Sequence, residues 1–176
     1  MSPDFDELGA WLRLLKVPGL GPAPARRLLA AFGSPQAIFA ATPDAVRAVL
    51  PRFAPDALQQ DTGWQGELER TWAWLHDAQA DTPRAVLTLA DAAYPAALLE
   101  AADPPLVLFA QGHPARLGRP AVAIVGSRHP TQQGVENAWA FARALSEAGV
   151  VVVSGLARGV DAAAHEGAMQ PLEAEG

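Results

Sequence analysis

The sequence predicts an α/β protein, with a small helical domain at the N-terminus and an incomplete, doubly wound parallel sheet at the C-terminus. In the first half of the chain, apolar residues recur at helical spacing between turns rich in Gly and Pro. In the second half, short apolar runs are bounded by turn residues, and a helical segment joins the last two runs. A crossover of that length joins parallel strands, which indicates a strand–helix–strand unit.

The helical domain is expected over residues 1–60. The turn VPGLGP at residues 17–22 separates the helix APARRLLAAF from a first helix whose apolar stripe is Leu8, Trp11, Leu12 and Leu15. Two further short helices, SPQAIFA and TPDAVRAVL, each open with an N-cap hydroxyl followed by proline at the first helical position, at Ser34 and Thr42.

Residues 61–83 are expected to connect the two domains through another helix, and residues 84–176 to form the incomplete sheet domain. The runs RAVLTLA, PLVLFAQG, AVAIVGS and VVVVSG are predicted to be buried strands. The helix TQQGVENAWAFARALSEAG joins the last two strands and ends at Gly149. Because a doubly wound sheet normally continues through several more strand–helix units, we expect the domain to be incomplete.

The composition excludes several classes of protein. No cysteine occurs among the 176 residues, which excludes disulfides, thiol catalysis and thiolate metal sites. No metal site is expected, because the histidines lie far apart, at His76, His113, His129 and His165. No apolar run is long enough for a membrane span, and the acidic start MSPDFDEL does not resemble a secretion signal. These features favour a cytoplasmic protein.

The charge distribution limits the kind of anion site that the chain can carry. The net charge is −6, and the acidic excess lies in residues 61–103, which contain eight acidic and two basic residues. This balance argues against the broad basic face of a general nucleic-acid coat protein. Any anion site is therefore expected to be a local pocket.

Two loops that contain Gly, Ser and Arg are predicted at one edge of the sheet, GSRHPT at 126–131 and SGLARGVDAAAH at 154–165. Each follows a parallel strand, so the loops share a crevice if the strands are neighbours about 4.8 Å apart. Glycines let backbone amides approach an anion, guanidinium groups bind phosphate bidentately, and hydroxyls donate hydrogen bonds. The predicted phosphate-binding residues are Gly126, Ser127, Arg128, Ser154, Gly155, Arg158 and Gly159. The alternative is that the glycines only form turns and the arginines lie in solvent.

Asp161 and His165 are four residues apart and are expected to support this pocket from one helix face. Asp161 could cap the helix or orient Arg158, and His165 is expected to form a hydrogen bond to the loop from within. His165 lacks an obvious nucleophile partner for catalysis. No cofactor is expected, because GxGxxG, the Walker motif and an acidic residue at the end of the last strand are all absent.

The VPGLGP turn raises a second possibility of phosphate contact. A helix–hairpin–helix turn can present backbone amides to DNA phosphate, helped by basic residues that follow it. The residues concerned are Gly19, Gly21, Arg26 and Arg27. The alternative is an ordinary pair of packed helices.

Together these segments resemble the DNA-processing family called DprA or Smf. VAIVGSRHPTQQG and VVVSGLARGVDAAAHEGAM resemble its two signature segments, and YPAALLEAADPPLVLFAQG resembles the stretch before them. VPGLGPAPARRLLAAFGSPQAIFA is similar to its N-terminal helical domain, so the resemblance covers residues 8–169. It implies a small helix-hairpin-helix, SAM-like domain followed by a partial Rossmann-like parallel sheet domain.

The resemblance also implies a function, which is not enzymatic. Family members bind single-stranded DNA that enters the cell during natural transformation, protect it and help to load the RecA recombinase. The DNA contacts would be made by Gly126, Ser127, Arg128, Ser154, Gly155 and Arg158. Members use the region after residue 169 for further DNA contacts, homodimerisation and RecA contact. The residues alone leave open a nucleotide or sugar-phosphate hydrolase that uses Asp161 or His165, and a scaffold whose helices bind a partner.

Overall fold

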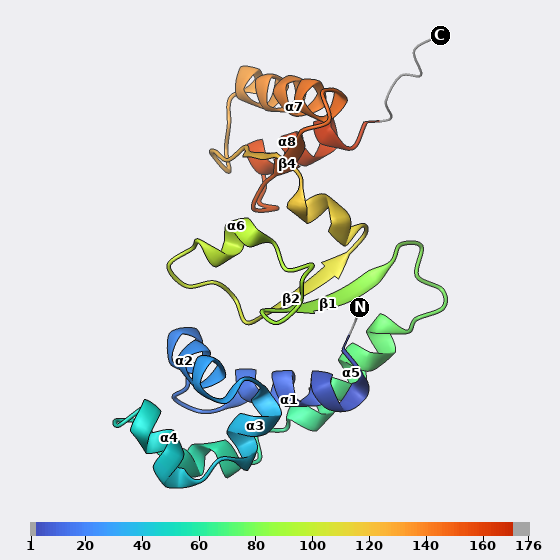
Figure 1. Ribbon diagram of the computed structural model, residues 1–176. Helices are drawn as coiled ribbons and strands as arrows, with labels where there is room; N and C mark the ends of the chain where they lie inside the picture. Colours follow the sequence, from blue (N-terminus) through green and yellow to red (C-terminus); the bar gives the residue numbers. More distant parts are fainter. Residues whose placement is uncertain (1–2, 171–176) are drawn as a thin grey trace. The chain divides into compact units, whose positions relative to one another are not determined.

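The computed structural model describes residues 3–170 and divides the chain into two compact units, Met1–Gly118 and Arg119–Gly176. Each unit is described by itself, with the element labels of Figure 1. The last six residues of the predicted sheet domain, 171–176, lie outside the described residues.

The first unit begins with a series of helices. They are α1 (Phe5–Lys16), α2 (Pro22–Phe32), α3 (Pro35–Ala40), α4 (Pro43–Val49), the 3₁₀ helix η1 (Pro55–Gln59) and α5 (Trp64–Leu75). Of these, α1, α3 and α4 have side-chain N-caps. The Ser34 hydroxyl accepts a hydrogen bond from the Ala37 amide at 3.2 Å, and the Thr42 hydroxyl accepts one from the Ala45 amide at 3.3 Å. The predicted capping hydroxyls of α3 and α4 are therefore confirmed.

The core of this unit is built around α1. Leu8, Trp11 and Leu12 are buried as predicted, whereas Leu15 is 40% exposed and Leu14 is fully buried. The prediction for Leu15 was wrong because α1 packs against both α3 and α5, so that its buried face is wider than one stripe and centred differently. At the edge of the α1–α5 contact, the rings of Phe5 and Trp72 meet edge to face, with centroids 5.1 Å apart.

An antiparallel pair of strands belongs to the same unit, β1 (Arg84–Thr88) and β2 (Val107–Gln111), with Val86 opposite Phe109. The chain between them includes α6 (Ala96–Leu99), and the 3₁₀ helix η2 (Pro114–Gly118) follows β2. The packing thus groups β1 and β2 with the helices, although the sequence suggested that they belong with the later strands. The domain boundaries at residues 60 and 83 stay a prediction.

The second unit contains the predicted strand–helix–strand arrangement. It consists of β3 (Ala121–Ala123), α7 (Gln132–Glu147), β4 (Val151–Val153) and α8 (Val160–Ala168). The strands are parallel, with Val122 opposite Val152, which confirms the predicted crossover. The hydroxyl of Thr131 caps α7 by accepting from the Gly134 amide, and Gly149 has a φ of +77° just after the helix ends.

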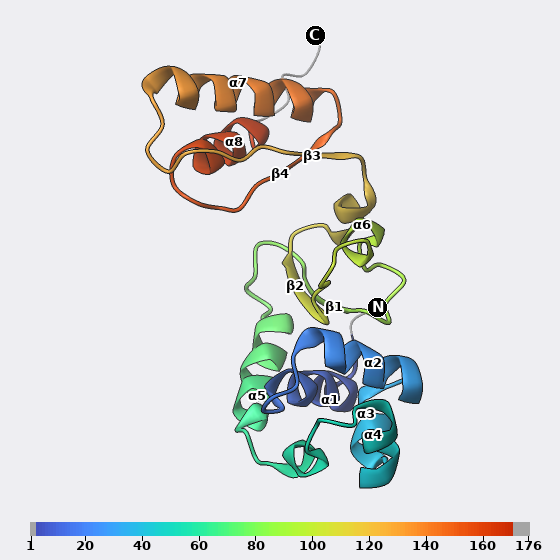
Figure 2. The same ribbon diagram turned by 90° about the vertical axis from the view of Figure 1, so that its left-hand side faces the viewer.

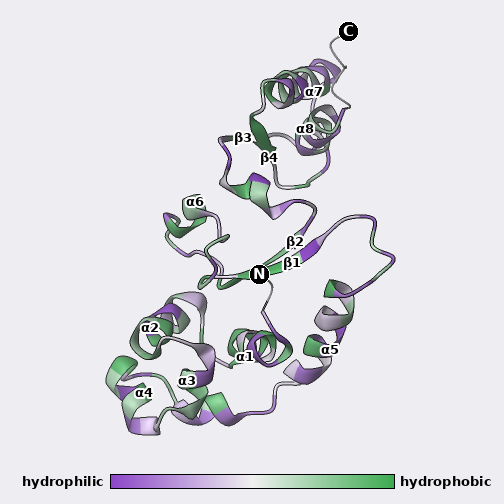
Figure 3. Cartoon of the chain, turned by 45° about the vertical axis from the view of Figure 1, so that its right-hand side comes forward, coloured by the Kyte–Doolittle hydropathy of each residue, from purple (hydrophilic) through white to green (hydrophobic). Residues whose placement is uncertain are grey.

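The strands of this unit are not buried on both faces. All three residues of β3 are exposed, and Val122 and Val153 expose 42% and 50% of their surface. Figure 2 labels the four elements of this unit, and Figure 3 shows β4 in the colour of hydrophobic residues, with α7 and α8 on the same side of the strands. The prediction that these two runs are buried was therefore wrong. Burial of a parallel sheet requires cover on both faces, and the described part of the chain supplies helices on one.

Within residues 3–170, no helix is both long enough and apolar enough to cross a membrane.

Candidate functional site

The two glycine-containing loops of the second unit lie against each other. The Val160 amide, at the start of α8, donates a hydrogen bond to the Ser127 carbonyl oxygen at 3.1 Å. Gly159 has a φ of +81°, and a Cβ added there would collide with that oxygen and lie 2.9 Å from the Arg128 carbonyl carbon. The backbone of the loop that carries Arg158 therefore packs on the backbone of the loop that carries Arg128, as two neighbouring strands predict.

Gly126 permits the same close approach from the other side. A Cβ at this position would lie 2.9 Å from one methyl group of Val160 and 3.0 Å from the other. Gly126 and Gly159 are thus needed because the two loops pack closely together; a turn in isolation would not require glycine for this reason.

Ser154 joins the ends of the two strands. Its hydroxyl donates a hydrogen bond to the Ile124 carbonyl oxygen at 2.7 Å. A serine hydroxyl has a single proton, so Ser154 can donate to a phosphate only if this bond opens. Its position in the structure is that of a link between the strand ends.

Asp161 holds the second loop in shape. This residue is only 6% exposed, and its Oδ2 accepts a hydrogen bond from the Gly155 amide at 3.1 Å and a longer one from the Ala157 amide at 3.5 Å. Capping of α8 or pairing with Arg158 was predicted, but the carboxylate instead binds amides of its own loop. Because the Gly155 amide is used in this way, it is not a free donor to an anion.

We expect Asp161→Ala to loosen this loop. Removing the carboxylate leaves part-buried amides without their acceptor, which should cost about 2 kcal/mol. Hydrogen exchange read by mass spectrometry should speed up in peptides that cover residues 154–161, whereas Glu166→Ala, an exposed change on the same helix, should leave exchange there unaltered. Equal protection in both variants would contradict the role assigned to Asp161.

His165 does not support the loop as predicted. Its Nε2 is buried and has no hydrogen-bond partner among the described residues. Spacing along α8 places His165 and Asp161 one turn apart, but only Asp161 bonds to the loop. The prediction of a hydrogen bond from His165 to the loop was wrong.

The groups that remain open to an anion form a smaller set. Arg128 and Arg158 are exposed, and neither has an ion pair or hydrogen bond within residues 3–170. The backbone amides of Gly126, Ser127 and Arg128 are likewise without a partner in that range. The Ser127 hydroxyl accepts from the His129 amide at 3.0 Å, which leaves its own proton available. These donors lie on exposed residues of two touching loops, so the arrangement can bind an anion such as phosphate.

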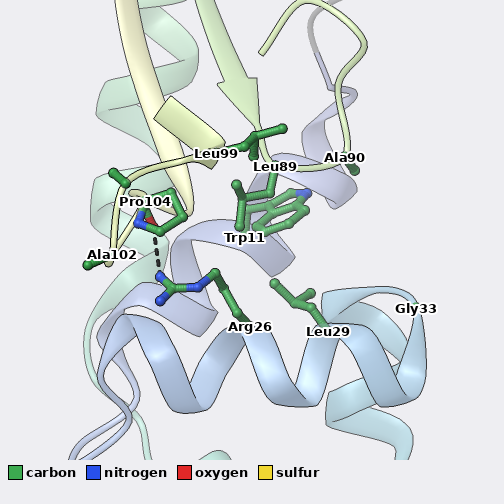
Figure 4. Close-up of a pocket in the computed structure, with 10 residues that line it drawn as sticks. Trp11, Arg26, Leu29, Gly33, Leu89, Ala90, Leu99, Ala102 and Pro104 are labelled. Atoms are coloured by element: carbon green, nitrogen blue, oxygen red, sulfur yellow. Dashed lines mark hydrogen bonds between the residues drawn. The ribbon is translucent and has the colours of Figure 1, made fainter. Parts of the chain in front are cut away.

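The N-terminal turn presents fewer donors than its motif suggests. Gly19 has a φ of +72° and Gly21 is the N-cap of α2, but Arg26 is engaged inside the unit. Its Nη1 lies 2.7 Å from Asp103 Oδ1 and donates to the Pro104 carbonyl oxygen at 2.9 Å (Figure 4). Arg27 is exposed and donates to the Val49 carbonyl oxygen. The second phosphate contact stays a prediction, and Arg26 could join it only by leaving Asp103.

The ion pair between Arg26 and Asp103 is one of several polar contacts that fix the 101–105 segment. Tyr94 donates from its hydroxyl to the Pro105 carbonyl oxygen at 2.8 Å. Burial raises the pKa of the Tyr94 hydroxyl, and the nearby Arg26 opposes that rise. Arg26 therefore has a packing role that its position after the VPGLGP turn did not reveal.

Two segments of the chain match models of known protein families. Residues 85–174 match the model of the family described as DNA recombination-mediator protein A, and residues 12–60 match a SAM-like helix-hairpin-helix tandem. The protein Smf of Synechocystis is 33% identical over 168 residues, which are 93% of this chain and 42% of that protein. The DNA processing protein DprA of Streptococcus pneumoniae is 42% identical over 83 residues, which are 47% of this chain and 29% of that protein.

A solved structure supports the same assignment. The crystal structure of DprA from Streptococcus pneumoniae matches with a TM-score of 0.68 and 26% identity, over 97% of this chain and 55% of that one. The chain thus spans less than half of the curated relatives it matches and about half of the solved structure. On the evidence of the family model and the shared fold, the chain belongs to the DNA recombination-mediator protein A family, also called DprA or Smf.

Proposed function

We propose that this chain binds single-stranded DNA through the two loops of its second unit. The observation that carries the proposal is the junction between Val160 and Ser127, which brings the loops of Arg128 and Arg158 together. Exposed guanidinium groups and unpaired amides suit the phosphates of a polymer better than those of an enclosed cofactor.

The wider role follows from the family. We propose that the protein protects DNA that enters the cell during natural transformation and assists loading of RecA, without catalysing a reaction. We also propose homodimerisation and RecA contact through the region after residue 169, as the family resemblance implies; the chain itself spans 42% of the Smf protein it matches. A cytoplasmic location follows from this role. The proposed DNA-contacting residues are Gly126, Ser127, Arg128 and Arg158, supported by Ser154, Gly155, Gly159 and Asp161.

Arg128→Ala should weaken binding to a labelled oligo-dT about tenfold, because one charge-assisted contact to phosphate is lost. The slope of log affinity against log salt should become shallower by about 0.7, the value for one phosphate on a single strand. Fluorescence anisotropy at several salt concentrations measures both quantities.

Arg119→Ala is the matched control. Arg119 is also exposed, but it precedes the opposite end of β3, roughly 20 Å of extended chain from Gly126. It should change affinity much less. Equal losses in the two variants, or no loss in Arg128→Ala, would count against a site at the loops.

Hydrolysis of a nucleotide or sugar phosphate is less well supported. The Asp161 carboxylate is occupied by loop amides, and the Nε2 of His165 is buried, so neither group is presented to a substrate as acid or base. Turnover of nucleoside monophosphates that disappears in Asp161→Asn would favour the hydrolase instead.

A further inference from the structure

A second concave site lies beside the VPGLGP turn, in the first unit. This pocket has a volume of about 640 Å³ and is bounded by the turn, by α2 and by the segment between α4 and η1. Its lining residues include Pro18, Gly19, Arg27, Arg52 and Phe53. We propose that it binds an acidic segment of a partner protein, with a large apolar side chain inserted between the two arginines.

The walls of the pocket are mainly apolar. Besides the glycine and the arginines, every lining residue is apolar, namely Pro18, Pro24, Leu50, Pro51, Phe53, Ala54 and Ala57. Pro, Phe and Leu surfaces of this kind gain free energy by covering an apolar side chain. The volume falls in the range that holds a small ligand or a few side chains of a peptide.

The charged groups of the pocket have one sign. Arg27 is held in place by the hydrogen bond from its Nη2 to the Val49 carbonyl oxygen at 2.7 Å. Arg52 is exposed and has neither an ion pair nor a hydrogen bond in the described part of the chain. Among the described residues, no acidic side chain lines this pocket, so carboxylates of a partner would meet two arginines that no carboxylate of the pocket already pairs with. Sequence reasoning missed Arg52 because it lies 25 residues from Arg27 and outside any motif.

A nucleic-acid backbone fits this pocket less well. A helix–hairpin–helix turn binds phosphate mainly through backbone amides, but Pro18, Pro22 and Pro24 have none. The Leu20 amide donates to the Val17 carbonyl oxygen, and the Ala25 amide to the Gly21 carbonyl oxygen. Few amides therefore remain at the turn, whereas the apolar walls are extensive. A partner segment with an apolar side chain flanked by carboxylates would pack against the apolar walls and pair with the two guanidinium groups.

Selection from a random peptide library displayed on phage tests this proposal. The whole chain, immobilised, should enrich peptides that combine Asp or Glu with Leu, Ile or Phe. The most enriched peptide, made with a fluorescent label, should bind at least tenfold more weakly to Arg52→Glu than to the unaltered chain. Arg116→Glu, a reversal at an exposed position outside this pocket, should bind it unchanged. In ¹⁵N spectra, the peptide should shift the amides of Gly19, Ala54 and Ala57.

Three results of the peptide measurements would overturn the proposal. These are no enrichment above a blank surface, enriched peptides that lack acidic residues, and peptide affinity that does not respond to Arg52→Glu. A loss of oligo-dT affinity in Arg52→Glu as large as that in Arg128→Ala would assign the pocket to DNA instead. Because Arg128 lies in the other unit, Arg128→Ala should leave peptide binding unchanged, so this inference and the proposed DNA function can fail separately.

Discussion

Gly167→Ala is expected to destabilise the second unit by about 3 kcal/mol. A Cβ at residue 167 would collide with the Trp139 carbonyl oxygen and lie 2.9 Å from its carbonyl carbon and 3.0 Å from its Cα. These are backbone atoms of α7, so the added methyl group can be accommodated only if the two helices separate. The gain in helix propensity from alanine, about 1 kcal/mol, is smaller than this cost.

Separation of α7 and α8 should strongly destabilise the second unit, because few other contacts stabilise it. Its described strands are only three residues long, and the contact between α7 and α8 is its most extensive interface. Hydrogen exchange read by mass spectrometry should therefore speed up across residues 132–147 and 160–168. Peptides from the first unit should keep their protection, because that unit has its own core.

Gly134→Ala serves as the comparison for this variant. Gly134 also lies in a helix of the second unit, but a Cβ there would be 3.4 Å from Pro130 Cβ and from Thr131 Oγ1, a tight contact with side chains only. Its effect on exchange should be small. If the amides of α7 and α8 exchanged as slowly in Gly167→Ala as in Gly134→Ala, the close crossing of the helices at Trp139 would be refuted.

Gly159→Ala is expected to separate the two loops and to lower affinity for oligo-dT more than Arg128→Ala does. Two costs combine at this position. The backbone, with φ +81° and ψ −123°, lies in a region that residues with a Cβ rarely adopt, and the Cβ would collide with the Ser127 carbonyl oxygen. Together they should destabilise the junction by about 3 kcal/mol, from strain and overpacking. Anisotropy with oligo-dT and hydrogen exchange over residues 124–131 measure the two consequences.

Gly149→Ala separates backbone strain from collision. Gly149 has a similar φ of +77°, but no atom lies within 4 Å of an added Cβ. It should cost about 1 kcal/mol and leave the loops, and therefore DNA affinity, nearly unchanged. Wild-type affinity in Gly159→Ala would show that contact between the loops is not needed for binding.

Several features of the structure could be predicted from the sequence because they depend on short-range rules. The caps at Ser34 and Thr42 need only a hydroxyl in front of a helix, and the end of α7 needs only Gly149. The parallel crossover between β3 and β4 follows from the length of the helical segment between them. The closeness of the two loops follows in turn, because neighbouring parallel strands end at the same edge.

Other features depend on partners that are distant in sequence, and these the sequence did not reveal. Arg26 follows a phosphate-type turn, yet it pairs with Asp103, 77 residues away. The hydroxyl of Ser154 donates to the Ile124 carbonyl oxygen, and the Gly155 amide donates to the Asp161 carboxylate. These bonds within the fold occupy two donors that the motif suggested for phosphate and the carboxylate that was expected to orient Arg158. An apolar run also does not show whether one or both faces of a strand are covered, so the sequence could not predict that β3 is exposed.

The sequence by itself determined the longer helices, the caps of α3 and α4, the end of α7, the parallel crossover and the family, because periodicity, capping and motif spacing are local properties. Only the tertiary structure decided which polar groups of the motifs are consumed within the fold and which stay open to a ligand. The physical reason is that each hydrogen-bonding group has few partners to choose from, and that choice depends on which distant segments are packed beside it.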